Sequence, residues 1–214
     1  MDLHAAHDRP GPMEETPVPG NAYDRYHARN PVARYLMDQF LETVARLVRP
    51  LEIASVLDVG CGEGHLLAHL HVVKPEVRCT GIDISERIVE EARATYPALH
   101  FEVGNVYGLD LPDRSHDLVV AADLLQQLHD PQRALRELTR VSRRYVLLTV
   151  PREPLWRLMN MARLAYLDEW GSPPGHVQHY RRGDFLNMVR GHLRLIEVAL
   201  PLPWVVVLGR KGTV

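Results

Sequence analysis

Between residues 51 and 150 the sequence alternates between short apolar runs and longer stretches whose apolar residues recur every three to four positions. The runs are too short for helices and are bounded by polar or turn-forming residues, which is typical of strands. Some of the stretches between them begin with helix-capping residues such as Ser85 and Asp130. This alternation predicts βαβ units, a parallel sheet and right-handed crossovers. The five predicted strands are residues 55–59, 78–82, 99–103, 117–122 and 145–150.

Both ends of the chain add elements to this core. Asn30 and Pro31 predict the start of a helix that ends before Pro50. A short helix over about 182–190 precedes two apolar runs, 193–200 and 204–210, which only three residues separate, so they should form an antiparallel hairpin. We therefore expect an α/β, doubly wound (Rossmann-like) fold with a seven-stranded, mostly parallel sheet and a C-terminal antiparallel hairpin.

The same patterns divide the chain into five regions. Residues 1–22, rich in proline and without apolar periodicity, are expected to be a flexible tail, and 23–50 an N-terminal cap helix. Residues 51–150 form the core. The stretch 151–180 is too long for a plain connection and is expected to be an insert that acts as a substrate lid, and 181–214 completes the sheet.

Charge and composition exclude several classes of protein. The 214 residues carry 25 Lys and Arg against 27 Asp and Glu, a net charge of −2, which disfavours a nucleic-acid partner. No apolar run approaches the roughly 20 residues that span a bilayer, and no secretory signal precedes the core, so we expect no stable membrane insertion. Cys61 and Cys79 show no metal-ligand spacing, which predicts no metal site and a reduced, cytoplasmic compartment.

The most informative stretch is Val-Leu-Asp-Val-Gly-Cys-Gly-Glu-Gly, residues 56–64. A buried strand ends in an acidic residue and a glycine-rich turn that opens a helix, and Asp83 follows nineteen residues after Gly64. A nicotinamide dinucleotide site would need a third glycine where His65 stands, which argues against a dehydrogenase. The run resembles the first motif of the class I S-adenosylmethionine-dependent methyltransferases, in particular small-molecule, type 11-like members.

This resemblance implies S-adenosyl-L-methionine as cofactor, with S-adenosyl-L-homocysteine as product. It places the glycines against the methionine and ribose parts, Asp58 near the ammonium group, and Asp83 on the ribose hydroxyls. Residues Tyr26 and Arg29, before the first helix, are candidates to close over the cofactor. The other implied cofactor-binding residues are Gly60, Cys61, Gly62, Gly64, Ile84, Asn105, Val106 and Ala122.

Candidates for catalysis and acceptor binding lie after the fourth and fifth predicted strands. His176 and His179 are candidate general bases, because an unperturbed imidazole titrates near pH 6.5. For each one taken singly, a structural role as a loop histidine that is hydrogen-bonded to the backbone is favoured over the role of base. The expected substrate-binding residues are Gln127, Arg152, Trp156 and Tyr180.

The range of possible acceptor classes is restricted mainly by a motif that the sequence lacks. Methyltransferases acting on nucleobase amines commonly carry Asn/Asp-Pro-Pro-aromatic after the fourth strand, where this chain reads Ala-Ala-Asp-Leu (121–124). A small-molecule acceptor, such as a secondary metabolite, a quinone-like or a lipid-linked compound, is favoured, with an O, C, N or S nucleophile. The alternatives are a methyltransferase of protein side chains and a non-catalytic, cofactor-binding regulatory relative. The chain is expected to act as a monomer or homodimer.

Overall fold

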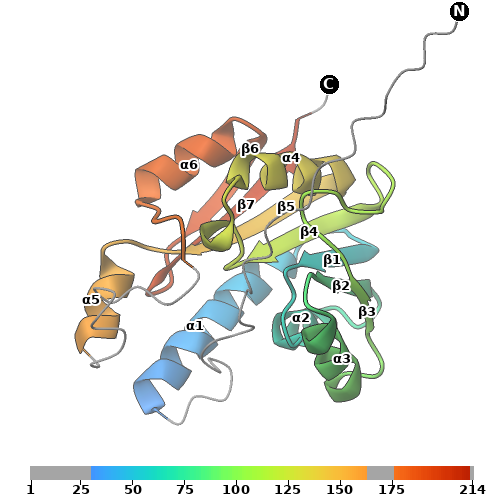
Figure 1. Ribbon diagram of the computed structural model, residues 1–214, viewed down its shortest axis with the longest axis horizontal. Helices are drawn as coiled ribbons and strands as arrows, with labels where there is room; N and C mark the ends of the chain where they lie inside the picture. The colour runs from blue at the N-terminus through green and yellow to red at the C-terminus, as the bar shows by residue number, and fades with distance from the viewer. Residues whose placement is uncertain (1–29, 163–175, 213–214) are drawn as a thin grey trace, which may run out of the picture.

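A seven-stranded sheet in the order β3-β2-β1-β4-β5-β7-β6 forms the centre of the protein (Figure 1). The structure is a computed structural model that describes residues 30–162 and 176–212. Neighbouring strands from β3 to β5 run parallel, whereas β7 is antiparallel to both β5 and β6. The predicted doubly wound sheet with its C-terminal hairpin is thus confirmed. The strands are β1 (Ser55–Val59), β2 (Arg78–Asp83), β3 (His100–Val103), β4 (His116–Ala122), β5 (Ser142–Pro151), β6 (Leu193–Ala199) and β7 (Trp204–Lys211).

Short polar side chains start the helices where the sequence predicted. The Asn30 Oδ1 accepts a hydrogen bond from the backbone N–H of Val32 at 2.8 Å, and the Asp130 Oδ1 accepts one from Arg133 at 2.9 Å. Proline stands at the first position of both helices, where its missing N–H costs nothing. The helices are α1 (Pro31–Val48), α2 (His65–Val73), α3 (Glu86–Thr95), α4 (Pro131–Val141), α5 (Leu155–Ala162) and α6 (Arg182–Arg190), with a 3₁₀ turn η1 (Leu125–Gln127).

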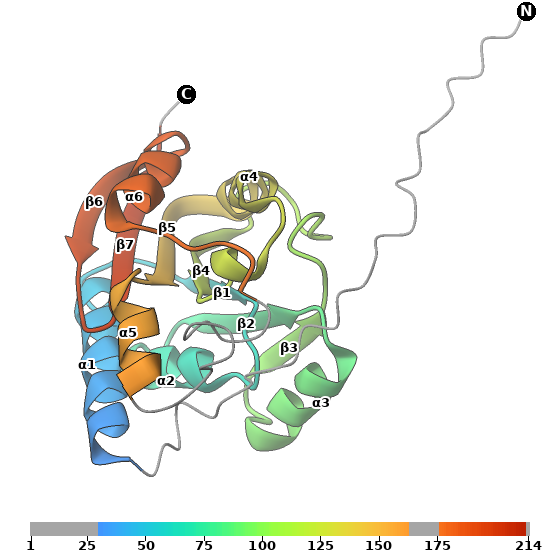
Figure 2. The same cartoon turned by 60° about the vertical axis from the view of Figure 1, so that its left-hand side comes forward.

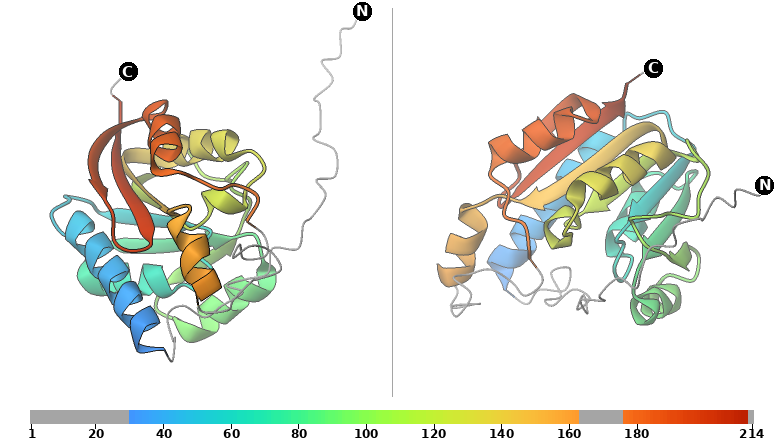
Figure 3. Two further views of the ribbon diagram at one scale, coloured as in Figure 1. Left: turned by 90° about the vertical axis from the view of Figure 1, so that its left-hand side faces the viewer. Right: turned by 45° about the horizontal axis from the view of Figure 1, so that its top comes forward.

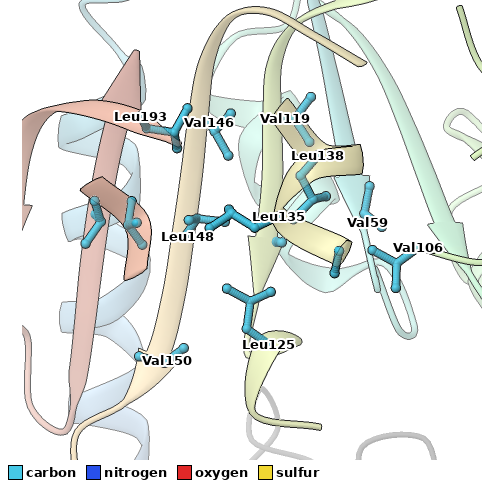
Figure 4. Close-up of a cluster of buried hydrophobic side chains, with 14 of the residues drawn as sticks. Val59, Val106, Val119, Leu125, Leu135, Leu138, Val146, Leu148, Val150 and Leu193 are labelled. Carbon is cyan, nitrogen blue, oxygen red and sulfur yellow. The ribbon is translucent and has the colours of Figure 1, made fainter. Parts of the chain in front are cut away.

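Two apolar layers cover the faces of the sheet, because successive side chains of a buried strand point to opposite sides. In β4, Leu118 and Val120 lie in the layer formed with α1, α2 and α3. Val119 and Ala121 lie in the layer with α4 and α6, where Figure 4 shows Leu135 of α4. Figure 3 shows α1 on one side of the sheet and α4 and α6 on the other. Since both faces are covered, the strands read as continuous apolar runs.

Some elements are longer in the structure than the sequence predicted, and the insert is described only in part. β5 runs over ten residues, because its start also pairs with β4 and its end with β7. Within the insert, helix α5 begins at Leu155 and is described as far as Ala162. Within the two described stretches, no helix is both long enough and apolar enough to cross a bilayer.

Candidate cofactor and acceptor site

The carboxyl ends of β1, β2, β4 and β5 meet at one edge of the sheet, because these strands are parallel neighbours. The chain proceeds outward from β1 to β3 on one side and from β4 to β5 on the other, so the strand order reverses between β1 and β4. Open α/β sheets bind their ligands in the crevice at such a reversal. The residues that follow these strand ends therefore define the candidate site.

The glycine turn after β1 adopts a backbone that other residues rarely accept. Gly60, Gly62 and Gly64 have φ angles of 74°, 54° and 83°. A β-carbon on Gly60 would lie 2.9 Å from Leu124 Cδ1, and one on Gly64 would lie 2.6 Å from Phe101 Cζ. Both the left-handed conformation and the close packing therefore require glycine at these positions.

Asp83, at the end of β2, is held in place by backbone donors. Its Oδ2 accepts a hydrogen bond from the Gly62 N–H at 3.0 Å, and its Oδ1 accepts one from the Ser85 N–H at 3.0 Å. Burial raises the pKa of the Asp83 carboxyl, against these two hydrogen bonds, which lower it. Each carboxylate oxygen retains acceptor capacity. Asp83 can thus bind a pair of neighbouring hydroxyl groups at the glycine turn.

Asp58, the last residue but one of β1, is only 1% exposed. Its Oδ1 is buried and has no hydrogen-bond partner among the described residues. Burial, and secondarily the nearby Asp83 charge, raise the pKa of Asp58 to about 7. A buried acceptor of this kind is costly unless something donates to it, and a cationic or N–H-bearing ligand would do so.

Cys61 and Ile84 flank these carboxylates and differ in exposure. Cys61 is buried in the apolar layer, and burial raises the pKa of its thiol. It is therefore a packing residue with an unreactive thiol. The Ile84 side chain is 54% exposed directly after Asp83, which makes it an apolar surface available to a flat ring.

Asn105 and Val106 form the turn after β3. The Asn105 Oδ1 accepts a hydrogen bond from the Tyr107 N–H at 2.9 Å, so this side chain fixes its own loop. Val106 is buried in the layer that contains α4, so its side chain packs the turn against the core. The side-chain oxygen of Asn105 can accept a second hydrogen bond, as a contact with an exocyclic amine requires.

At the end of β4, Ala122 is half-buried and is followed by Asp123 in a left-handed conformation, with φ 52°. The Asp123 carboxylate accepts hydrogen bonds from Trp204 Nε1 at 2.9 Å and from the Thr149 hydroxyl at 3.2 Å. These donors come from β7 and β5. Because they are far away in sequence, no local signal in the sequence indicated that they fix this turn.

The side chains of Gln126 and Gln127 donate hydrogen bonds to the same backbone carbonyl. Both side-chain Nε2 groups donate to the Asp123 carbonyl, at 2.7 and 2.8 Å. Since a carbonyl only accepts, the amide nitrogens must face it, and the amide oxygens point elsewhere. Gln127, an expected acceptor-binding residue, is half-buried at the site, whereas Gln126 is buried and was not singled out from the sequence.

The two candidate bases are brought to the same end of β4. The backbone N–H groups of Val177 and Gln178 both donate to the Gln126 carbonyl at 2.9 Å. Figure 2 shows this segment passing from the end of β4 to α6. His176 is half-buried and His179 is exposed. The structure thus places both histidines near the sheet edge, although they are distant in sequence from β4.

The remaining predicted acceptor residues differ in position. Tyr180 is 9% exposed and its hydroxyl donates to the Leu125 carbonyl at 3.4 Å, so it packs in the core. Arg152 is half-buried just after β5. Trp156 of α5 is half-buried with its ring 5.8 Å from that of Trp204, against the layer that contains α1. Arg152 and Trp156 thus border the site edge, and Tyr180 supports it from inside.

Tyr26 and Arg29, predicted to close over the cofactor, lie outside the described residues. Among the residues that the structure describes, no group of three or more His, Cys, Asp or Glu side chains is arranged to hold a metal ion.

Comparisons with known proteins agree with this geometry. Residues 56–144 match the family described as a methyltransferase domain. Demethylmenaquinone methyltransferase of Thermotoga maritima is 30% identical over 122 residues, covering 56% of this chain and 53% of that protein. Ajmaline N-methyltransferase of Rauvolfia serpentina is 33% identical over 94 residues, covering 41% and 32%. The chain thus spans about half or less of the length of these curated relatives.

The fold also matches solved structures. The crystal structure of magnesium protoporphyrin IX methyltransferase from Synechocystis PCC 6803, with bound S-adenosylhomocysteine, superposes with a TM-score of 0.66 at 17% identity. The match covers 88% of this chain and 91% of that chain, and at this identity it establishes the fold alone. In its matched domain, its glycine turn with Asp58 and Asp83, and its sheet order, the chain is thus similar to S-adenosylmethionine-dependent methyltransferases.

Proposed function

We propose that the protein transfers a methyl group from S-adenosyl-L-methionine to a small-molecule acceptor. The observation that carries this proposal is the buried Asp58 Oδ1, which accepts no hydrogen bond from the described residues and lies in the strand that ends at the glycine turn. Such an atom is expected in a site that a ligand completes, and it suits the ammonium group of the cofactor, directly or through a water molecule.

The other residues at this edge fit the remaining parts of the cofactor. The Asp83 carboxylate, oriented by the Gly62 N–H, suits the two ribose hydroxyls. The exposed Ile84 side chain offers an apolar surface to the adenine ring. Gly60, Gly62 and Gly64 allow the backbone to approach the ligand without a β-carbon in the way.

The bound cofactor supplies an electrophilic methyl group on a positively charged sulfur. The protein's task is then to align the acceptor with this methyl group and to exclude water. We expect Arg152, Trp156 and Gln127 to contact the acceptor. The curated relatives are named as a demethylmenaquinone methyltransferase and an ajmaline N-methyltransferase, which supports a small-molecule acceptor.

Calorimetric titration with S-adenosylhomocysteine tests the proposal, with NAD and NADP as competing candidates. We expect binding of S-adenosylhomocysteine alone. Asp83→Ala should weaken it by about 100-fold or more, because the variant loses two hydrogen bonds to a charged group and each contributes about 1.5–3 kcal/mol. Asp110→Ala, at an exposed position after β3, is the matched control and should leave the affinity unchanged. Binding of a nicotinamide cofactor, or equal affinity in the Asp83 variant, would contradict the assignment.

A further inference from the structure

Exposed apolar side chains are concentrated at the edge of the sheet where its parallel strands end. The described part of the chain exposes nine large apolar side chains, and only Val72 and Ile196 lie away from this edge. Val72 is near the end of α2, which leads back to the amino end of β2, and Ile196 is in the middle of β6. Single exposed apolar residues need no explanation, but a concentration of them on one side of a protein indicates a partner.

Four of these side chains form a group that we call the apolar rim: Val32, Tyr35, Leu158 and Leu202. They are between 49% and 64% exposed. The first two are in the first turns of α1, Leu158 is on α5, and Leu202 is in the turn between β6 and β7. Because β7 is antiparallel to both β5 and β6, this turn lies at the edge where β5 ends. Figures 2 and 3 show α5 beside α1 and close to this turn.

Aromatic contacts beneath the apolar rim join its three elements. The ring of Phe40 in α1 lies 4.8 Å from that of Trp204, measured between centroids. The ring of Trp156 in α5 lies 5.8 Å from the same Trp204 ring. Trp204 is the first residue of β7 and follows the turn that carries Leu202. The exposed side chains of the rim are therefore presented by a packed base.

The beginning of α1 projects past the sheet edge. Val32 precedes Phe40 by eight residues, which corresponds to roughly 12 Å along a helix. Figure 1 shows α5 and the beginning of α1 extending beyond the strand ends. Side chains exposed on such projections can enter a soft surface, whereas a folded partner would need recesses that match three separate elements. The shape of this region thus favours a lipid surface.

Arginines border the apolar rim. The three segments that carry or adjoin it, residues 31–38, 152–162 and 181–184, contain five arginines and three acidic residues. The third segment belongs to this region because the Glu153 N–H donates to the Tyr180 carbonyl at 3.2 Å. Since the chain as a whole has a net charge of −2, positive charge is concentrated around the rim. The arginines are Arg34, Arg152, Arg157, Arg181 and Arg182, and the acidic residues are Asp38, Glu153 and Asp184.

We propose that the apolar rim docks the protein on the surface of a bilayer that contains anionic lipids. Binding at such a surface grows with the apolar area buried among the headgroups and with the attraction of basic residues to anionic lipids. Tyrosine, as at Tyr35, is enriched at this level of a bilayer, and the exposed Arg34, Arg181 and Arg182 suit lipid phosphates. The docking is peripheral and turns the acceptor side of the site toward the bilayer. It needs neither cofactor nor acceptor, so it stands independently of the proposed function.

Co-sedimentation with vesicles tests the docking in the full chain. We expect binding to phosphatidylcholine vesicles that contain about 30% phosphatidylglycerol, and binding about tenfold weaker or less to phosphatidylcholine alone. Salt at about 0.5 M should release most of the bound protein, because it screens the charges. Tyr35→Ser combined with Leu158→Ser should weaken binding by about tenfold or more. Val72→Ser combined with Ile196→Ser, at positions that are 76% and 50% exposed, is the matched control and should leave binding unchanged.

The contribution of the arginines is measured in the same assay. Arg181→Gln combined with Arg182→Gln should weaken binding to the anionic vesicles by about tenfold or more, since each arginine near such a surface contributes about fivefold. Binding to neutral vesicles should not change. Arg194→Gln combined with Arg210→Gln, at exposed positions of β6 and β7, removes the same charge elsewhere and should have little effect.

A fluorescent label reports directly whether the apolar rim enters the bilayer. Leu158→Cys and Val72→Cys are labelled with a polarity-sensitive fluorophore, and the native Cys61 and Cys79 are buried. We expect the emission to shift to shorter wavelength on addition of anionic vesicles at position 158 and not at position 72.

Several outcomes would overturn the proposal: no binding to anionic vesicles, equal binding to both kinds of vesicle, equal losses in a pair of substitutions and its control pair, or an emission shift at both labelled positions. Sedimentation velocity without lipid tests a second copy of the chain as the occupant. A dimer that forms with increasing concentration and is abolished by Tyr35→Ser with Leu158→Ser would assign the apolar rim to self-association and overturn the docking on lipid.

Discussion

Replacing Asp58 with asparagine removes a buried negative charge and should stabilise the protein while weakening its ligand binding. The carboxyl group is 1% exposed, and burial together with Asp83 raises its pKa from 3.8 to about 7. As the pH rises from 3.8 to 7, the unfolded chain loses this proton and the folded chain retains it. The folded state therefore loses stability over this range and regains none above it.

The magnitude follows from the difference between the two pKa values. Each pH unit between them corresponds to about 1.4 kcal/mol, so the full penalty above pH 7 is about 4 kcal/mol. From pH 5 to about 7 the penalty grows by about 3 kcal/mol. Asp58→Asn carries no such dependence, and its stability relative to the wild type should rise by up to this amount over the same range.

The assay is urea unfolding of both proteins at intervals from pH 5 to 8.5. Comparing the two proteins at each pH cancels the groups that titrate equally in both. Asp117→Asn is a control in which the expected change in stability has the opposite sign. Burial raises the pKa of Asp117, but hydrogen bonds from the Ala54 N–H and the Arg143 guanidinium lower it by more. This variant should be less stable than the wild type at neutral pH, and the difference should vanish in acid as the native carboxylate is protonated.

A stability difference between Asp58→Asn and the wild type that stays constant from pH 5 to 8.5 would refute the reasoning. It would mean that Asp58 is solvated or paired in the folded protein. A stabilised variant that also binds S-adenosylhomocysteine less tightly would show that the protein retains a costly charge for its ligand.

Two further predictions concern residues that shape the site. Gly64→Ala should lower the free energy of unfolding by about 2–4 kcal/mol, because φ is 83° and the new β-carbon would lie 2.6 Å from Phe101 Cζ. Thermal unfolding measures this, and Gly108→Ala, where nothing lies within 4 Å, should change it by less than about 1 kcal/mol. Trp204→Phe keeps the aromatic packing and removes the donor to Asp123 Oδ2, which should cost about 1.5–3 kcal/mol in urea unfolding. Unchanged stability in this variant would show that water replaces the indole N–H.

Local signals explain why much of the site was accessible from the sequence. The glycine turn requires positive φ angles, which glycine adopts readily, and Asp83 ends the next strand along the chain. Parallel strands carry such residues to one edge, so sequence spacing alone brings Asp83 to Gly62. The caps at Asn30 and Asp130 are equally local, since each side chain bonds to its own helix.

Long-range contacts account for what the sequence did not reveal. Asp123 is fixed by Thr149 and Trp204, and the Gln126 carbonyl anchors the segment that carries the candidate bases. These partners belong to β5, β7 and the insert, and nothing in their own neighbourhoods marks them as partners.

The sequence by itself determined the fold class, the order of the strands along the chain and the position of the glycine turn, because apolar periodicity, capping and glycine conformation act within a few positions of the chain. Only the tertiary structure decided which atoms are buried and which donors meet which acceptors. Burial raises the pKa of Asp58 to about 7, and this burial depends on the apolar layer that α1, α2 and α3 form over one face of the sheet. The chemistry of the site therefore follows from packing, which local sequence patterns do not record.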